Sequence, residues 1–260
     1  MKVLILPDTE AATARAADIL CEALAKKTEA TLGLATGGTM LPLYATLAER
    51  CRSGLVSFAR ARTFNLDEYV GVGPDHPCSF HRYMADAFFG TTDIDPRQAH
   101  LPRGDAPDPD AEAARYEARI VAAGGIDLQL LGIGRNGHIG FNEPTSSLGS
   151  RTRTKTLTES TRAANRSFFD RDEDVPRFAI TMGIATILDA RACLMLATGP
   201  AKAEAVAAMI EGPVSAYCPA SALQLHPKVT VVLDKAAAGR LRLADYYHHV
   251  HPNGRDRVLA

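Results

Sequence analysis

The chain has 260 residues, of which 46% are hydrophobic and 23% charged, a composition typical of a globular protein with a large core. Its 29 Lys and Arg residues almost balance its 30 Asp and Glu residues, so the net charge of −1 excludes a global field that would attract nucleic acid or an anionic membrane. The five cysteines never have CxxC spacing, and the N-terminal apolar stretch stops at Pro7 and Asp8. These features argue against a disulfide framework, a thiolate metal site, a signal peptide and a membrane span, and they predict a cytoplasmic protein.

Short apolar runs alternate with longer amphipathic stretches along the chain. The apolar runs predict β-strands at residues 3–6, 31–35, 61–66, 127–133, 178–182, 193–198 and 229–233. The amphipathic stretches include predicted helices at residues 11–26, 41–50, 110–123 and 201–210. This alternation predicts right-handed βαβ units, and hence a single α/β domain over residues 1–260 with a mostly parallel sheet and helices on both faces.

In an open α/β sheet, ligands bind beyond the carboxyl ends of the strands, so the loops after the apolar runs are the candidate sites. The first such loop is Thr36-Gly37-Gly38-Thr39, which follows an apolar run and precedes a helical pattern. Its glycines permit tight turns, and its amides and hydroxyls can donate to an anion, so the loop can cradle a phosphate. The lysine and spacing of a P-loop are absent, which argues against a nucleotide. A plain strand-to-helix turn is the alternative.

The second loop contains the adjacent acids Asp67 and Glu68. Adjacent side chains in a β conformation point to opposite sides, so we expect one to face a pocket and the other to anchor a loop. A carboxylate at a strand end can act as a general base toward a carbon acid next to a carbonyl or imine. A helix cap or a solvated charge is the alternative interpretation.

The third loop covers residues 132–144 and has the sequence GIGRNGHIGFNEP. Its glycines formally match GxGxxG, but Pro144 and a polar continuation replace the long helix that a dinucleotide site requires, so we reject NAD binding. His138 and Glu143 lie five residues apart on this loop. A histidine can take and return a proton near neutral pH, and a nearby carboxylate can orient it, so this pair predicts acid–base chemistry.

Histidines elsewhere in the chain carry weaker signals. His248, His249 and His251 lie near a polar C-terminus without a carboxylate or cysteine at ligand spacing, so we predict no metal site there. His226 is flanked by Leu225 and Pro227, and we expect it to shape the wall of the site.

Several motifs, in order along nearly the whole chain, closely resemble those of glucosamine-6-phosphate deaminases. They are TGGT at 36–39, FNLDEYVG at 64–71, LGIGRNGHIGFNEP at 131–144, SSLGSRTRTKTLT at 146–158 and LQLHPK at 223–228. The resemblance implies a modified Rossmann-like sheet and the conversion of glucosamine 6-phosphate and water into fructose 6-phosphate and ammonia, without a metal or organic cofactor. A 6-phosphogluconolactonase-like hydrolase and a non-catalytic sugar-phosphate sensor are the alternatives. The first needs no base like Asp67, and the second would lose its catalytic side chains.

The resemblance also implies roles for residues of the candidate site. Asp67 would remove the C2 proton of the substrate and assist its delivery to C1. His138 would open the sugar ring by moving a proton between the anomeric hydroxyl and the ring oxygen, with Glu143 as its partner. Many relatives have Asp where this chain has Asn136. Because Asn carries no negative charge, we expect Glu143 to orient the histidine while Asn136 fixes its tautomer as a neutral partner.

Phosphate binding would fall to the loop at 36–39 together with Lys202, which matches a lysine of the family. A second cation is expected in the segment from Asn165 to Phe169. The family usually has NSRFF there, whereas this chain has NRSFF, so the arginine appears one position early, at Arg166. Either Arg166 reaches the phosphate or Lys202 carries more of the contact.

A regulatory site is the last implication of the resemblance. Ser146, Arg153, Lys155, Thr156 and Tyr246 match positions that bind the allosteric activator N-acetylglucosamine 6-phosphate at a subunit interface in the hexameric branch of the family. We therefore expect a homo-oligomer, with a hexamer favoured. A basic, solvated loop is the alternative.

Overall fold

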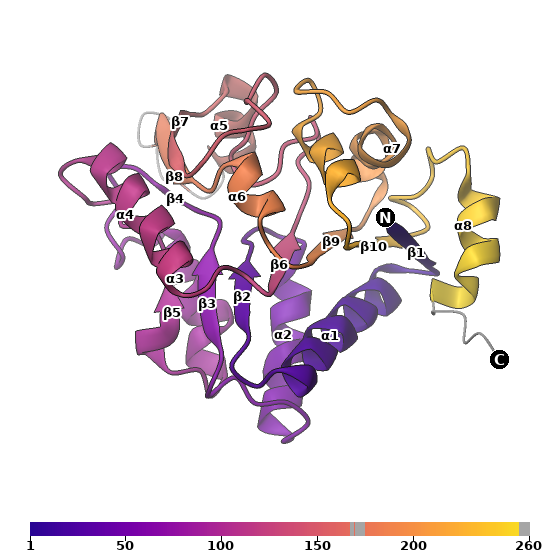
Figure 1. Cartoon of the computed structure of the whole chain (residues 1–260), viewed down its shortest axis with the longest axis horizontal. Helices are drawn as coiled ribbons and strands as arrows, with labels where there is room; N and C mark the ends of the chain where they lie inside the picture. Colours follow the sequence, from indigo (N-terminus) through magenta and orange to yellow (C-terminus); the bar gives the residue numbers. More distant parts are fainter. Residues whose placement is uncertain (167–168, 170–174, 255–260) are drawn as a thin grey trace.

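The central sheet of the protein has seven strands, and every neighbouring pair in it is parallel (Figure 1). The structure is a computed structural model that describes residues 1–166, 169 and 175–254. In spatial order the strands are β1 (Lys2–Leu6), β10 (Val229–Asp234), β9 (Cys193–Ala197), β6 (Leu128–Leu131), β2 (Thr31–Leu34), β3 (Arg62–Asn65) and β5 (Ala99–His100). The predicted mostly parallel α/β sheet is confirmed.

Helices cover both faces of this sheet: Figure 1 shows α1 and α2 on one side and α6 and α7 on the other. The helices are α1 (Thr9–Lys26), α2 (Met40–Arg52), α3 (Phe80–Ala87), α4 (Pro109–Ala122), α5 (Glu159–Asn165), α6 (Ile184–Leu188), α7 (Ala203–Glu211) and α8 (Ala244–Val250). Short 3₁₀ turns lie at Phe89–Thr91, Pro96–Gln98, Pro200–Lys202, Pro219–Leu225 and Pro252–Gly254. None of the helices in the described part of the chain is long and apolar enough to span a membrane.

Local sequence signals explain where the longer helices begin. The side chain of Asp8 accepts a hydrogen bond from the backbone N–H of Ala11 at 2.8 Å and so caps α1. Asp108 caps α4 in the same way, and Pro109 occupies the first helical position, where a missing N–H costs nothing. These caps fix the helix starts to within two residues of the predicted ones.

A second, smaller sheet corrects one prediction. The segment at 178–182 was expected in the parallel sheet, but β8 (Phe178–Thr181) instead lies between β4 (Asp67–Tyr69) and β7 (Arg153–Thr156), antiparallel to both. Its apolar run has the pattern of a buried strand, and such a pattern does not say which sheet contains the strand. A separate apolar cluster that includes Tyr69, Phe141 and Ala179 packs against this sheet.

Candidate active site

The loop at residues 132–144 follows β6 and depends on its glycines. A Cβ atom on Gly134 would lie 2.2 Å from Cε1 of His138, so the imidazole lies directly against the glycine backbone. Gly137 has φ +81°, and a Cβ atom there would lie 2.6 Å from Sγ of Cys218. Side chains at either position would displace the loop, so these glycines allow the histidine to occupy its place.

A hydrogen-bonded chain connects His138 to a buried carboxylate. Nδ1 of His138 lies 2.7 Å from Oδ1 of Asn136, and Nδ2 of Asn136 donates to Oε2 of Glu143 at 2.7 Å. Because the amide nitrogen donates to Glu143, its oxygen must accept from His138, so Nδ1 carries a proton. In the neutral ring the lone pair is therefore on Nε2.

Glu143 is only 1% exposed, yet it is surrounded by donors. The hydroxyl of Thr161 donates to its Oε1, and the hydroxyl of Thr158 lies 3.3 Å from the same atom. Burial alone would raise the pKa of Glu143, but hydrogen bonds from His138, Thr161 and Asn136 lower it to about 2. Glu143 is thus negatively charged at neutral pH, and its Oε2 lies 3.5 Å from Nδ1 of His138.

Asp67 has the opposite environment. It begins β4, is 5% exposed, and accepts no hydrogen bond at its carboxylate from any described residue. Burial raises its pKa to about 8, with a further contribution from the negative charge of Glu68. A Cβ atom on Gly140 would lie 3.4 Å from Oδ2 of Asp67, so this carboxylate faces the glycine-rich loop. The arrangement brings a carboxyl group that titrates near neutral pH next to the His138 loop.

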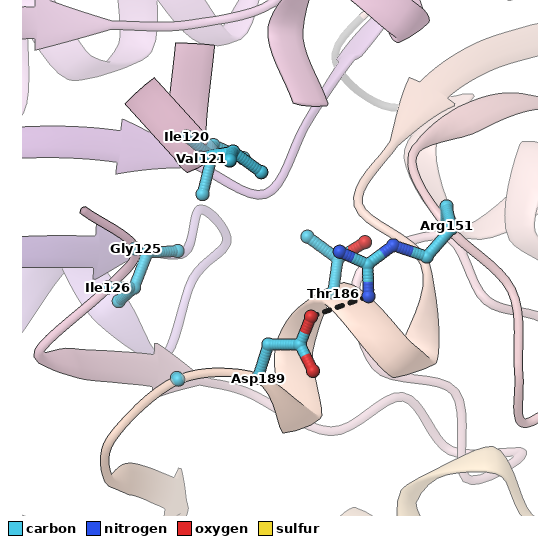
Figure 2. Close-up of a pocket in the computed structure, with 8 residues that line it drawn as sticks. Ile120, Val121, Gly125, Ile126, Arg151, Thr186 and Asp189 are labelled. Carbon is cyan, nitrogen blue, oxygen red and sulfur yellow. Dashed lines mark hydrogen bonds and ion pairs between the residues drawn. The ribbon is translucent and has the colours of Figure 1, made fainter. Parts of the chain in front are cut away.

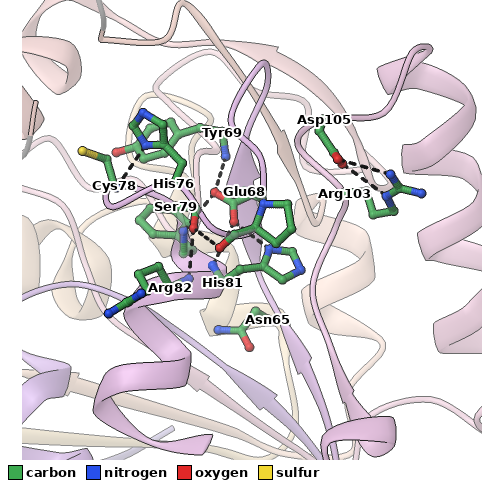
Figure 3. Close-up of polar contacts among 12 residues, drawn as sticks. Asn65, Glu68, Tyr69, His76, Cys78, Ser79, His81, Arg82, Arg103 and Asp105 are labelled. Atoms are coloured by element: carbon green, nitrogen blue, oxygen red, sulfur yellow. Dashed lines mark hydrogen bonds and ion pairs between the residues drawn. The ribbon is translucent and has the colours of Figure 1, made fainter. Parts of the chain in front are cut away.

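Glu68, the neighbouring acid, anchors the polypeptide around it (Figure 3). Its carboxylate accepts hydrogen bonds from the backbone N–H groups of Tyr69, Phe80 and His81 at 2.9–3.0 Å, and it lies 2.9 Å from Nδ1 of His81. These contacts attach the start of α3 to β4. Glu68 therefore has a structural role beside Asp67.

The loop at 36–39 is exposed at its two glycines, and hydrogen bonds to the carbonyl of Gly37 fix its backbone. Gly37 has φ +114°, and its carbonyl accepts hydrogen bonds from the backbone N–H of Met40 and from the hydroxyl of Tyr83, each at 2.9 Å. Only glycine adopts such a backbone without strain. Tyr83 lies on α3, so α3 connects the Glu68 anchor to the candidate phosphate loop.

The two expected phosphate cations differ in how they are held. Nζ of Lys202 donates to the carbonyl of Ile133 at 2.7 Å, which places the ammonium beside the His138 loop, and burial lowers its pKa, with a smaller contribution from the charge of Arg135. Arg166 is exposed at the end of α5. Residues 167 and 168 of the NRSFF motif lie outside the described residues.

His226 corrects a second expectation, because it does not line the site. Its Nε2 lies 2.7 Å from the carbonyl of Ala190, and its Nδ1 accepts from the backbone N–H of Lys228 at 3.0 Å. Ala190 precedes β9 and Lys228 precedes β10, so His226 lies at the start of these strands. The loops that carry His138 and Asp67 follow strand ends, at the opposite edge of the sheet.

The residues expected to bind an activator lie in two separate regions. Ser146 is buried, and its hydroxyl has no hydrogen-bond partner among the described residues. Arg153 on β7 donates to Oδ1 of Asn142 at 2.9 Å, and Lys155 and Thr156 follow on the same strand. Tyr246 is 59% exposed on α8. Figure 1 shows β7 and α8 at opposite sides of the molecule.

Thr158, Thr161 and Tyr83 also contact the site, although no motif in the sequence marks them. Thr158 and Thr161 lie 15 and 18 positions beyond Glu143 in the chain, and Tyr83 lies 46 positions beyond Gly37. Their only local signal is that the Thr158 side chain caps α5. No sequence spacing predicts that these hydroxyls point to Glu143 or to the carbonyl of Gly37.

A small cavity of about 60 Å³ lies between α4 and α6, away from the site (Figure 2). Arg151 and Asp189 form an ion pair at 2.6 Å on its wall, and Thr186 lies beside them. None of the predicted site residues lines this cavity. No group of three or more His, Cys, Asp and Glu residues in the described part of the chain is placed to hold a metal ion.

The amino-acid sequence matches a protein family described as glucosamine-6-phosphate isomerases/6-phosphogluconolactonase over residues 8–232. The chain belongs to this family. Within the family, a protein from Hahella chejuensis named glucosamine-6-phosphate deaminase is 54% identical over 250 residues, which cover 96% of this chain and 95% of that protein. A protein of the same name from Rhodopirellula baltica is 55% identical over 241 residues, covering 93% and 96%.

Two solved structures resemble this chain to different degrees. A structure of a monomeric glucosamine-6-phosphate deaminase superposes with a TM-score of 0.90 at 47% identity and covers 92% of this chain and 100% of its own. The 6-phosphogluconolactonase from Trypanosoma cruzi superposes with a TM-score of 0.76 at 20% identity, covering 93% and 97%. The second likeness shows a shared fold only. The similarity is therefore much greater to deaminases than to lactonases.

Proposed function

We propose that the chain is an enzyme that converts glucosamine 6-phosphate and water into fructose 6-phosphate and ammonia. One observation carries the proposal: the buried carboxyl of Asp67, with its raised pKa, faces the loop that holds His138 through Asn136 and Glu143. Two carboxylates with opposite pKa shifts around a histidine are suited to a reaction that needs both a general base and a proton shuttle. The relatives at about half identity support the same activity.

In the proposed reaction, His138 acts first. Its free Nε2 accepts the proton of the anomeric hydroxyl and returns it to the ring oxygen, which opens the sugar and gives an aldehyde at C1. Glu143 stabilises the transient imidazolium, because its negative charge lies 3.5 Å from Nδ1. Asn136 keeps the proton on Nδ1, so that Nε2 stays available.

Asp67 acts next, on the open chain. Its carboxylate removes the proton from C2, which is acidic because of the adjacent aldehyde, and the proton is returned at C1. As a proton of the amine passes to the C1 oxygen, the C2 amine becomes an imine. Water hydrolyses this imine with release of ammonia, so the enzyme would be classed as a hydrolase of a C–N bond. A base with a pKa near 8 matches this task better than an ordinary carboxylate.

The substrate phosphate would lie on the exposed backbone of Gly37 and Gly38, between the hydroxyls of Thr36 and Thr39. Lys202 would supply the positive charge, since its ammonium lies at the carbonyl of Ile133 at the edge of the same site. Arg166 would be a second ligand of the phosphate. We further propose that the reaction takes place in the cytoplasm.

Ammonia release from glucosamine 6-phosphate, compared with hydrolysis of 6-phosphogluconolactone by the same preparation, tests the proposed activity. We expect ammonia and fructose 6-phosphate in equal amounts and no lactone hydrolysis above the spontaneous rate. Lactone hydrolysis alone would support the lactonase alternative. Tight binding of the sugar phosphate without turnover would support the sensor, although a sensor has no need of Asp67, His138 and Glu143 together.

We also propose that N-acetylglucosamine 6-phosphate regulates an oligomer of this chain, with a hexamer favoured. The hydroxyl of Ser146, which has no hydrogen-bond partner among the described residues, and the cations of β7 supply donors for a phosphate. Tyr246 lies at the other side of the molecule. A single copy therefore does not complete the set, and a second copy must supply the tyrosine. The related deaminase described as monomeric makes the oligomeric state the first measurement.

Sedimentation with and without the activator, followed by kinetics, tests this regulation. The double substitution Arg153→Ala, Lys155→Ala should remove a 5- to 150-fold effect of the activator on affinity, the range of coupling energies of about 1–3 kcal/mol. A monomer with kinetics indifferent to the activator would contradict the proposal.

A further inference from the structure

A second hollow on the protein surface lies apart from the candidate active site. It has a volume of about 600 Å³ and lies where the starts of β3 and β5 meet the end of α4. Figure 1 shows these elements together at one edge of the molecule. The loops with Asp67 and His138 follow strand ends, whereas Arg62 of the hollow is the first residue of β3. None of the residues assigned to the active site or to the activator lines the hollow.

The charge of the hollow is strongly positive. Its basic lining residues are Arg62, Arg97, His100 and Arg119, and no Asp or Glu is among the residues that line it. Arg97 forms an ion pair with Asp95 at 2.7 Å, which offsets its charge. Neither Arg62 nor Arg119 has an acidic partner among the described residues. Within the described part of the chain, these two guanidinium groups therefore have no counter-ion.

Two side chains of the hollow, Arg62 and His100, are held in position by neighbouring residues. Nε of Arg62 donates to Oε1 of Gln98 at 2.9 Å, which fixes the plane of the guanidinium. The ring of His100 packs on the buried ring of Phe64, with 4.9 Å between the centroids. The hydroxyl of Tyr116 lies 3.1 Å from the carbonyl of His100 and holds its backbone. Fixed donors lose little entropy when they bind a ligand.

The pKa of His100 is also affected by the positive charge of the hollow. Burial lowers its pKa to about 4, and the positive charges of Arg119 and Arg62 contribute to the shift. The charged residues that line the hollow with this ring are Arg62, Arg119 and Arg97, and the charge of Arg97 is offset by Asp95. The positive charges of Arg62 and Arg119 disfavour protonation of His100, and the same charges attract an anion.

We propose that this hollow, lined by Arg62, His100 and Arg119, is a second binding site for a small organic dianion, distinct from the active site. Guanidinium groups bind carboxylates and phosphates equally through paired N–H donors, so the ligand class is a phosphate monoester or a small polycarboxylate. The volume of about 600 Å³ accommodates a molecule of metabolite size. A dianion bound there would neutralise the charges of Arg62 and Arg119.

Sulfate is the first probe, because it stays a dianion over the whole titration. The ring resonances of His100 in the full chain should be followed by NMR in sodium sulfate and in sodium chloride of the same ionic strength. A bound dianion next to the ring should raise the pKa of His100 by about one unit, and the change should saturate. Equal titration curves in the two salts would overturn the proposal.

Three variants make the test specific. Arg119→Gln changes an exposed residue, so the fold should persist, and it should raise the pKa of His100 in chloride but abolish the further effect of sulfate. Arg62→Gln should do the same. The control is Arg60→Gln, which removes an exposed arginine paired with Glu29 outside the hollow and should leave the sulfate response unchanged. A sulfate response that survives in the Arg62 and Arg119 variants would contradict the site.

The source of the dianion is identified by competition. Glucose 6-phosphate and citrate, each added against sulfate, should displace it with different affinities, and the stronger competitor identifies the ligand chemistry. Because activity is not the readout, failure of this proposal is distinguishable from failure of the proposed deaminase reaction. If neither competitor displaced sulfate, the hollow would not be a site for organic anions.

Discussion

The two acids of the candidate site, Asp67 on β4 and Glu143 on the glycine-rich loop, are both almost completely buried but have opposite electrostatic environments. Asp67 has no donor among the described residues, and burial raises its pKa to about 8. Glu143 is also desolvated, but hydrogen bonds from its neighbours lower its pKa to about 2. Burial therefore does not determine the charge of a carboxyl group. For these two acids, the hydrogen-bond donors directed at the carboxyl group decide whether its pKa is raised or lowered.

This difference suits the two acids to different tasks. A carboxyl group with a pKa near 8 can exchange a proton with a substrate at neutral pH, whereas one with a pKa near 2 stays ionised and can only attract a positive charge. Substitutions that remove the charge at one position or change the donors at the other test this division of roles.

The largest effect is expected from Asp67→Asn, which preserves shape and removes the base. Turnover of glucosamine 6-phosphate should fall by about 10²–10⁴, the usual cost of losing a general base. Exchange of the C2 proton with solvent should be lost while substrate still binds. Near-normal turnover would show that another group removes this proton.

Asp67→Asn should lower activity but raise stability at high pH. The pKa of Asp67 in the folded state, about 8, is above its value of about 4 in an unfolded chain. The contribution of this group to stability is thus fully present below pH 4 and is lost as pH rises through 8. Because Asn stays neutral, Asp67→Asn should be more stable than the wild type by about 1–4 kcal/mol at pH 9 and similar near pH 4. Urea unfolding at both pH values measures the difference, and a less stable variant at pH 9 would contradict the raised pKa.

Glu143→Gln should have the next largest effect. The folded-state pKa of Glu143 lies below its unfolded value, so its stabilising contribution is present above about pH 4 and lost as pH falls through about 2. At neutral pH the variant should lose about 1–3 kcal/mol of unfolding free energy and turn over about 10–100-fold more slowly.

Glu112→Gln is the matched control for Glu143→Gln. Glu112 is also a buried carboxylate with donors, since it accepts from the backbone N–H of Arg103 and from the side chain of Arg115, but it lies outside the site. It should lose stability without losing activity. Equal activity losses in the two variants would mean that Glu143 acts only through the fold.

Asn136→Asp should have a smaller effect, visible in the pH profile. A negative charge at this position, 2.7 Å from Nδ1 of His138, favours the imidazolium over the neutral ring. The acidic limb of the rate profile should move to higher pH. The new carboxylate would also replace the amide that donates to Glu143, so a rise in the pKa of Glu143 should accompany the shift. An unchanged profile would mean that the histidine does not control the rate.

The smallest effect is expected at Tyr83, whose hydroxyl holds the carbonyl of Gly37. Tyr83→Phe removes this hydrogen bond, worth about 1 kcal/mol, and should raise KM about 5-fold with little change in kcat. Tyr217→Phe, at an 82% exposed tyrosine, is the control and should change neither. A fall in kcat alone would argue that Tyr83 contributes to chemistry rather than to phosphate binding.

Much of the fold follows from local sequence signals. The apolar runs predicted every strand of the central sheet except the two-residue β5, and the caps at Asp8 and Asp108 locate their helices within a turn. The glycines around His138 also predict their loop from the sequence alone, because only glycine lets the backbone approach another group so closely. These features depend on chain geometry over a few residues, so the sequence alone determined them.

Other features depend on contacts between distant segments, and only the tertiary structure decided them. The apolar pattern of β8 is the same in either sheet, and its partners β4 and β7 assign it to the small one. His226, between Leu225 and Pro227, was expected to shape the wall of the site, but its contact with Ala190 places it at the opposite edge of the sheet. The donors around Glu143 come from α5, and the absence of donors around Asp67 among the described residues is equally a product of packing. The sequence supplied both carboxyl groups, but their pKa values depend on the desolvation and hydrogen bonds that neighbouring segments impose, and these exist only in the folded chain.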